Sequence, residues 1–239
     1  MMTVSMCRRL SYVAVLTLAI VAGTATTQSR PNVAAHGMVA SPEPLATDVG
    51  VAILKAGGNA FDAAAAVQFA LAVTYPAAGN IGGGGFMVGL TAVGETFALD
   101  FREEAPAAST EDMFVDGDGE MVAGLSTRTH KGVGVPGSVD GMLELVDQYG
   151  TLTRADVLAP AIRLARDGFP VSYALAGSLQ RNERLRQFAS SVEAFGLEGD
   201  GPDMGDLLQQ PDLAATLEAV ARDGRDGFYT GRVADLIVA

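Results

Sequence analysis

The chain has 239 residues, a length that suits one or two domains of ordinary size. Hydrophobic residues make up 49% and charged residues 18%, which excludes a disordered chain. The net charge of −12 argues against nucleic acid as a partner, because phosphate backbones repel an acidic protein. A single cysteine, Cys7, excludes an internal disulfide and a cysteine zinc cluster, and two histidines exclude a histidine-rich metal site. The sequence predicts neither a metal nor a cofactor.

The N-terminus has the pattern of a targeting segment. Arg8 and Arg9 precede an uncharged apolar run over residues 10–23, and a small residue follows at Ala25. This order of basic, apolar and small residues is typical of a secretory signal peptide. A membrane anchor is the alternative, but the run is shorter than the roughly 20 residues of a membrane span. We expect a signal peptide over residues 1–25, export to the periplasm or the extracellular space, and a mature chain without a stable membrane span.

The beginning of the mature chain predicts a strand followed by two helices. Residues 37–41 form a short apolar run that predicts the strand. Ser41 and Pro42 are residue types that cap a helix and occupy its first position, so we expect the first helix to begin there. Asn59, with Asp62 three residues later, predicts a second, capped helix.

A glycine-rich turn at residues 79–85 leads into a predicted hairpin. Four consecutive glycines, 82–85, cost backbone entropy, so they indicate either the close approach of another segment or a positive φ. Residues 86–91 and 96–102 then flank a short turn, which is typical of a hairpin. In the second strand one face is expected to carry Phe97, Leu99 and Phe101, and the other Asp100 and Arg102.

Arg102 is the first candidate binding residue. It ends a predicted strand, where a side chain is held more firmly than on a loop. Its planar guanidinium group fits a carboxylate. A salt bridge to Asp100 or Glu104 explains the same residue without any ligand, and residue chemistry alone favours that interpretation.

The C-terminal half predicts helices. One covers residues 138–149, and a second begins at the cap Thr153, with Pro160 expected to break or restart it. A further helix is expected from Pro211 to about residue 224. Residues 233–239 carry no stop signal, so we expect the chain to be a piece of a longer protein. Ser172 is expected to open a polar helix rich in arginines, which we expect to form a solvated face: Arg181, Arg184 and Arg186.

Two further motifs point to other functions. Residues 132–137 fit the G-x-G-x-x-G pattern of a dinucleotide-binding loop, with Asp156 about 20 residues later. No apolar strand precedes them, and Pro136 removes an N–H group that such a loop would donate, so a tight turn before a helix is favoured. The acidic residues within 116–120 lack the spacing of a calcium loop, which favours a hairpin turn.

A set of short segments in a fixed order resembles the γ-glutamyltransferase family. No single segment is specific, but the ordered set is. The resemblance runs from about residue 37 to the end of the sequence. The matching segments are 37–41, 50–54, 57–60, 62–64, 70–74, 79–87, 100–103, 134–137, 149–150, 164–168 and 228–231.

The resemblance implies an α/β fold, a four-layer αββα sandwich of the N-terminal nucleophile hydrolase type, which is incomplete in this chain. It implies a zymogen that cleaves itself into a large and a small subunit, and this chain would be the N-terminal part of the large one. A new N-terminal Thr of the small subunit would attack the γ-glutamyl carbonyl, with its own amine as base. The implied substrates are glutathione and related γ-glutamyl compounds, and the acceptor is water or an amine.

Two residues receive binding roles from the same resemblance. Arg102 matches the arginine that grips the α-carboxylate of the γ-glutamyl group, and Glu103 is the weaker substrate-binding candidate. No catalytic residue can be assigned, because the sequence stops before the Thr nucleophile and the glycines of the oxyanion hole. We therefore expect the chain to be inactive alone.

Three alternatives remain. One is a cephalosporin acylase-like amide hydrolase of the same superfamily; Arg102 favours the transferase, because a γ-glutamyl group has a free α-carboxylate to bind. The second is a truncated chain without catalytic function. The third is a nucleotide-binding protein that uses residues 132–137.

Overall fold

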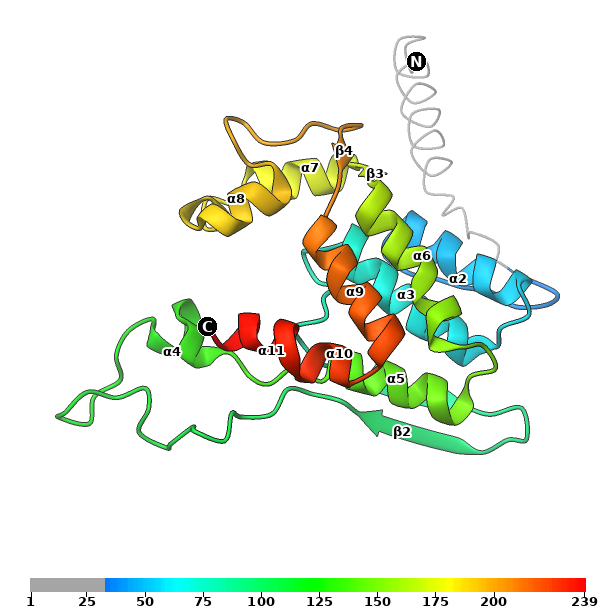
Figure 1. Cartoon of the computed structure of the whole chain (residues 1–239), viewed down its shortest axis with the longest axis horizontal. Coiled ribbons are helices and arrows are strands. Elements are labelled where there is room, and N and C mark those ends of the chain that lie inside the picture. Colours follow the sequence, from blue (N-terminus) through cyan, green and yellow to red (C-terminus); the bar gives the residue numbers. More distant parts are fainter. Residues whose placement is uncertain (1–32) are drawn as a thin grey trace, which may run out of the picture. The chain divides into compact units, whose positions relative to one another are not determined.

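A computed structural model of the protein describes residues 33–239, so the expected signal peptide lies outside the described residues. The chain divides into two units, residues 1–38 and residues 39–239, and the fold below is that of the second unit. In the described part no helix has both the length and the apolar character that crossing a membrane would require. The elements are mixed α and β, with helices predominating (Figure 1).

The second unit begins with helix α2 (Pro44–Lys55), two residues later than the sequence predicted. The cap is the Glu43 carboxylate, which accepts a hydrogen bond of 2.9 Å from the Ala46 N–H. Ser41 instead donates its hydroxyl to the Glu43 carbonyl at 2.8 Å. The strand predicted at residues 37–41 is not formed. A strand needs a hydrogen-bonding neighbour, and no described segment pairs with these residues.

Helix α3 (Ala60–Thr74) is the centre of the core, and it begins with the predicted capping box. The Asn59 side chain accepts from the N–H groups of Phe61 and Asp62, and the Asp62 carboxylate accepts from the Asn59 N–H at 2.8 Å. Small buried residues let three other helices approach α3 closely: α2, α5 (Ser138–Tyr149) and α6 (Arg154–Asp167) (Figure 1). Among the small core residues of α3 are Ala63, Ala65, Ala66 and Ala70.

The predicted hairpin is confirmed as β1 (Phe86–Leu90) and β2 (Thr96–Asp100), paired antiparallel with Phe86 opposite Asp100. The second strand ends at Asp100, so Arg102 lies two residues beyond it and not in its last position as predicted. Its inner face meets the core through aromatic rings. Phe97 stacks on Tyr149 of α5 at 4.1 Å between centroids and lies 5.6 Å from Phe61 of α3. The alternation predicted from the sequence therefore places Asp100 and Arg102 on the opposite, exposed face.

Helix α6 runs without interruption from Arg154 to Asp167, so the break predicted at Pro160 is wrong. Proline loses one helical hydrogen bond and crowds the preceding turn. That cost is offset by packing, since Val157, Leu158 and Ala161 around it are all 0% exposed. Helix α9 (Pro211–Asp223) lies alongside α6 and ends before Gly224, as predicted.

A smaller group of elements follows α6. Its parts are β3 (Phe169–Pro170), α7 (Tyr173–Gln180), η2 (Leu185–Gln187), α8 (Ala189–Phe195) and β4 (Leu207–Leu208). Helix α7 ends at Gln180, before the arginines that were predicted to belong to it, and the predicted solvated face is wrong for Arg186. Its guanidinium donates to the carbonyls of Leu197, Gly199 and Asp200, and thereby holds the loop after α8.

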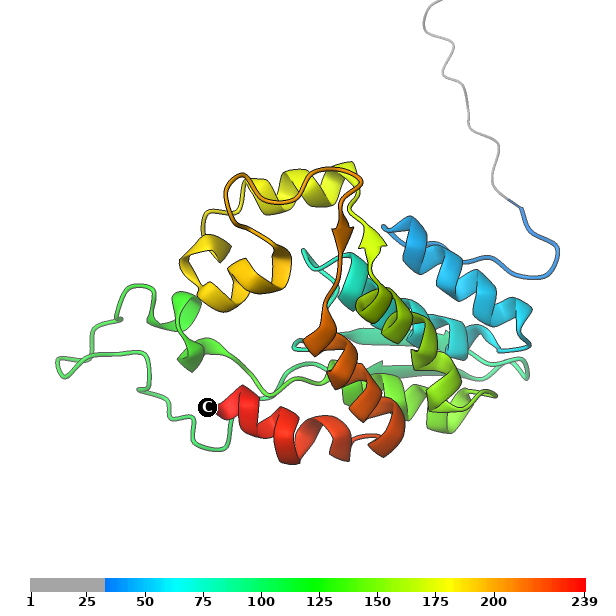
Figure 2. The same cartoon turned by 45° about the horizontal axis from the view of Figure 1, so that its top comes forward.

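The described chain closes with α10 (Asp226–Tyr229) and α11 (Gly231–Val238). Between β2 and α5 a long irregular segment leaves the end of the hairpin, extends away from the helices and returns (Figure 2). It contains only the short helices α4 (Leu125–Arg128) and η1 (His130–Gly132). The residues after β2 begin this excursion, and they include both candidates singled out from the sequence.

Candidate functional site

The glycine-rich turn lies directly against the end of β2. The Gly85 N–H donates to the Phe101 carbonyl at 3.2 Å, and the Phe101 N–H donates back at 3.0 Å. A Cβ atom on Gly84 would stand 2.5 Å from the Phe101 carbonyl oxygen and 2.7 Å from Cα of Arg102. None of the glycines 79–85 has a positive φ. Close approach, and not an unusual backbone conformation, therefore explains glycine at Gly84.

The backbone is also fixed on the other side of Arg102. Glu104 and Val135 exchange two hydrogen bonds, of 3.1 and 2.8 Å. The N–H groups of Gly137 and Ser138, at the start of α5, both donate to the Gly83 carbonyl, at 2.8 and 2.9 Å. The G-x-G-x-x-G segment is thus a tight turn before α5. The two amides at the start of this helix bind the glycine-rich turn, so they are not available to a phosphate.

The Arg102 side chain forms the salt bridge that residue chemistry favoured. Its Nε donates to Oδ1 of Asp100 at 3.2 Å, and its Nη2 donates to Oδ2 at 3.0 Å. The guanidinium carbon lies 4.9 Å from the centroid of the Phe86 ring. The hydrogen bond from Arg102 lowers the pKa of the Asp100 carboxyl, and the same bond raises the pKa of Arg102. Both groups are therefore charged at neutral pH.

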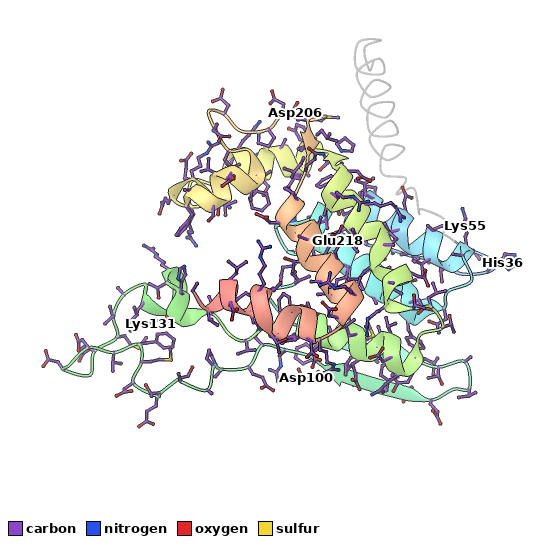
Figure 3. The ribbon with its side chains drawn as sticks, viewed as in Figure 1. His36, Lys55, Asp100, Lys131, Asp206 and Glu218 are labelled. Atoms are coloured by element: carbon purple, nitrogen blue, oxygen red, sulfur yellow. The ribbon has the colours of Figure 1, made fainter. Side chains whose placement is uncertain are left out.

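The two candidate binding residues point into different clefts. A cleft of about 570 Å³ is lined by Arg102 and Asp100 together with residues of α5 and α10, among them Glu144 and Tyr229. Glu103 lines a separate cleft of about 660 Å³ with Lys131. Successive side chains of an extended backbone point to opposite sides, which separates the two. Figure 3 shows Asp100 at the end of β2 and Lys131 in the long segment beyond it.

Sequence reasoning gave no role to the polar groups that join α10 to α5. The Tyr229 hydroxyl donates to the Pro136 carbonyl at 2.7 Å and accepts from the Asp140 N–H at 3.3 Å. Arg225 forms ion pairs with Asp140 and with Glu144. Burial raises the pKa of Tyr229, so its hydroxyl stays protonated and able to donate. These partners lie about 80 to 90 residues apart, and no local pattern could have connected them.

The described residues hold no group of three or more His, Cys, Asp or Glu side chains that could bind a metal. The acidic stretch 116–120 is the hairpin turn that its spacing favoured. Asp116 accepts from the N–H groups of Asp118 and Glu120, and Val115 bridges to Met121. The Asp116 carboxylate therefore stabilises the turn itself.

Comparison with known proteins identifies the family. The model of the γ-glutamyltranspeptidase family matches residues 46–239. The chain belongs to the γ-glutamyltranspeptidase family. It is 49% identical over 209 residues to the glutathione hydrolase proenzyme of Escherichia coli K12, a match that covers 87% of this chain and 36% of that protein. The chain therefore spans about a third of the length of this relative.

Solved structures of the family and of a neighbouring enzyme share the fold. Helicobacter pylori γ-glutamyltranspeptidase matches with a TM-score of 0.83 and 45% identity, over 87% of this chain and 60% of that chain. Cephalosporin acylase from Bacillus halodurans matches with a TM-score of 0.72 and 30% identity, over 90% of this chain and 42% of that one. The mixed α/β fold is thus shared with γ-glutamyltranspeptidases and with a cephalosporin acylase.

Proposed function

We propose that this chain is part of an enzyme that transfers the γ-glutamyl group of glutathione and related compounds to water or to amino acids and peptides. Membership of the γ-glutamyltranspeptidase family supports the reaction. The observation that carries the proposal is the position of Arg102, a charged, exposed guanidinium at the end of β2 in an open cleft. A planar guanidinium is the group best suited to hold the free α-carboxylate of a γ-glutamyl substrate.

In this proposal the chain contributes substrate binding, and the rest of the precursor contributes the chemistry. Arg102 binds the α-carboxylate, and Glu103, on the opposite side of the backbone, is the weaker binding candidate. A Thr exposed by self-cleavage attacks the γ-carbonyl with its own amine as base, and it forms a γ-glutamyl-enzyme that water or an amine resolves. Oxyanion donors stabilise the tetrahedral intermediates. The complete protein closes the four-layer αββα sandwich from a large and a small subunit.

The test is the Arg102→Ala variant of the full-length protein, assayed by release of p-nitroaniline from γ-glutamyl-p-nitroanilide. Loss of one partner of a charge-assisted pair is expected to lower kcat/KM by about 30-fold or more. Arg102→Lys should keep a kcat/KM between those of Arg102→Ala and the wild type, because an ammonium group has the charge but cannot form the planar fork. Unchanged kcat/KM in Arg102→Ala would remove Arg102 from the site.

A matched control comes from Arg222. This arginine is also exposed, 69% in its side chain, and pairs through Nε and Nη2 with the neighbouring Asp223, but it lies on α9 away from the cleft. Arg222→Ala removes the same charge and the same kind of ion pair. It should leave kcat/KM at the wild-type value, so that an effect of Arg102→Ala cannot be ascribed to net charge.

A cephalosporin acylase-like amide hydrolase is the second candidate, favoured only by the match to the Bacillus halodurans enzyme. The closer match in sequence and fold is to the Helicobacter pylori transpeptidase. Assaying γ-glutamyl-p-nitroanilide and the side-chain amide of a β-lactam side by side separates the two. Turnover of the β-lactam amide alone would favour the acylase.

We also propose export of the mature protein, which rests on the sequence pattern of residues 1–25. Mass spectrometry of protein recovered outside the cytoplasm should find a new N-terminus close to Thr26. Soluble cytoplasmic protein that begins at Met1 would contradict export.

A further inference from the structure

Three exposed side chains gather on the outer face of the hairpin where it ends. The register pairs Phe86 with Asp100, and Arg102 lies two residues further along the same face. Diagonal neighbours across a strand pair are within reach of aromatic and long side chains. The inner face of the same hairpin is packed on the core through Phe97. The outer cluster therefore has no part in core packing.

Two contacts restrain the guanidinium of Arg102. Asp100 accepts from Nε at 3.2 Å and from Nη2 at 3.0 Å, so one edge of the planar group is bound in two places. The guanidinium carbon also lies over the Phe86 ring, 4.9 Å from its centroid. Asp100 also accepts from the Arg102 backbone N–H at 3.1 Å, which ties the carboxylate to the same residue's main chain. The two hydrogen bonds to Asp100 and the contact with the Phe86 ring together restrain the guanidinium.

The restraint leaves one edge of the guanidinium available. A guanidinium group presents two forks to carboxylates, the Nε–Nη side and the end formed by the two Nη atoms. Asp100 takes the first, and within residues 33–239 Nη1 donates to no acceptor. The Arg102 side chain is 62% exposed and lines the open cleft beside α5 and α10. The available end is thus presented to solvent in the cleft.

We infer that Asp100 is a positioning residue for substrate binding, which holds Arg102 so that its Nη1–Nη2 end faces the α-carboxylate of the donor. This inference rests on the proposed function. An arginine that is already oriented loses less side-chain freedom when a ligand binds, and that gain appears as affinity. Phe86 assists through the cation–π contact between its ring and the same guanidinium.

Asp100 also has an effect that opposes substrate binding, so the direction in which KM changes on its substitution shows which effect dominates. Its negative charge reduces the attraction of the site for a second carboxylate. If this repulsion dominated, removing the Asp100 carboxylate would tighten substrate binding. If the orientation of Arg102 dominates, removing the carboxylate weakens substrate binding. Because Asp100 binds a different edge from the one offered to substrate, it does not compete for the same donors, and orientation should dominate.

Asp100→Asn in the full-length enzyme is the test. Asparagine keeps an oxygen that can accept from the Arg102 backbone N–H, but its amide nitrogen cannot accept from Nη2. For γ-glutamyl-p-nitroanilide we expect KM to rise about fivefold, with kcat changed little. For 4-aminobutyryl-p-nitroanilide, which lacks the α-carboxylate, we expect no change in kcat/KM. Asp118→Asn, the same substitution in the exposed turn at residues 116–120, should behave as wild type.

A double-mutant cycle with Arg102→Ala separates the possible outcomes. Asp100→Asn should have no further effect in the Arg102→Ala background, because the residue acts through Arg102. If Arg102→Ala itself left kcat/KM unchanged, the proposed role of Arg102 would fail. If Arg102→Ala lost activity but Asp100→Asn left KM unchanged or lowered it, the positioning role alone would be overturned. Equal losses with both donors would show a structural role and overturn it as well.

Discussion

Two aspartates of this protein, Asp62 and Asp100, carry the same functional group in contrasting surroundings, one buried and one exposed. Asp62 is 0% exposed and joins the start of α3 to the loop before α6. It accepts from the N–H groups of Asn59, Thr151 and Leu152 and from the Thr151 hydroxyl, at 2.8 to 3.3 Å. Asp100 is 53% exposed in its side chain and accepts only from Arg102 among the described residues.

The difference separates stability from binding. Burial by itself raises the pKa of Asp62, but the hydrogen bonds from Asn59, Thr151 and Leu152 together outweigh it and lower the pKa. The Asp62 carboxylate is therefore kept charged by its hydrogen-bond donors against the effect of burial. The pKa of Asp100 is lowered by a single residue, Arg102, first through its side-chain hydrogen bond and then through its backbone N–H and its charge. We expect Asp62 to affect unfolding and not catalysis, and Asp100 and Arg102 to affect catalysis and not unfolding.

Asp62→Ala should have the largest effect. It removes the capping box of α3 and leaves the N–H groups of Thr151 and Leu152, whose hydrogen bonds are part-buried, without this acceptor. Loss of a cap together with part-buried donors left unsatisfied is expected to lower the free energy of unfolding by about 3 kcal/mol. Urea denaturation of the full-length protein measures this. Asp223→Ala, on the exposed end of α9, is the control and should change it by less than about 0.5 kcal/mol.

Gly84→Ala tests whether the hairpin end must keep its close packing to hold Arg102. The new Cβ would stand 2.5 Å from the Phe101 carbonyl oxygen, so the backbone has to move. Overpacking of this kind costs about 2 kcal/mol of stability. Because the displaced segment carries Arg102, kcat/KM for γ-glutamyl-p-nitroanilide should fall as well.

Gly82→Ala is the matched control for this substitution, in the same run of glycines. A Cβ there meets nothing within 4 Å, and Gly82 has no positive φ. We expect stability and kcat/KM near the wild-type values. If Gly82→Ala and Gly84→Ala had the same effect, flexibility of the turn, and not close approach at Gly84, would explain the glycines.

Local sequence signals predicted the parts of the fold that depend on nearby residues. The capping box at Asn59 and the alternation of the hairpin were both confirmed, because each is decided within a few residues. The site was partly predictable for the same reason, since Asp100 at the end of β2 and Arg102 just after it are two positions apart on one side of the extended backbone. The sequence left open whether a salt bridge or a ligand explains Arg102, and the structure contains the salt bridge in a form that leaves one guanidinium edge available.

The wrong predictions share a dependence on distant partners. Ser41 was preferred as a cap, but Glu43 takes that position and also accepts from the Thr74 hydroxyl of α3 at 3.0 Å. Pro160 was expected to break a helix that packing against α3 and α9 keeps intact. Arg186 was assigned to solvent, but binds carbonyls 11 to 14 residues away. In each case tertiary contacts outweighed local propensity.

Tyr229→Phe should have the smallest effect. It tests whether a residue that lines the cleft affects stability, as Asp62 does, or substrate binding, as Arg102 does. Tyr229 lines the Arg102 cleft, yet its hydroxyl is committed to the Pro136 carbonyl and the Asp140 N–H. Since the side chain is half-buried, loss of these hydrogen bonds should lower the free energy of unfolding by about 1 kcal/mol. KM should not change, because the residue anchors α10 and does not reach Arg102 by any hydrogen bond in the described structure.

Tyr173→Phe, at an 81% exposed tyrosine, is the control and should leave stability unchanged. A rise in KM without loss of stability in Tyr229→Phe would instead place its hydroxyl among the substrate-binding groups.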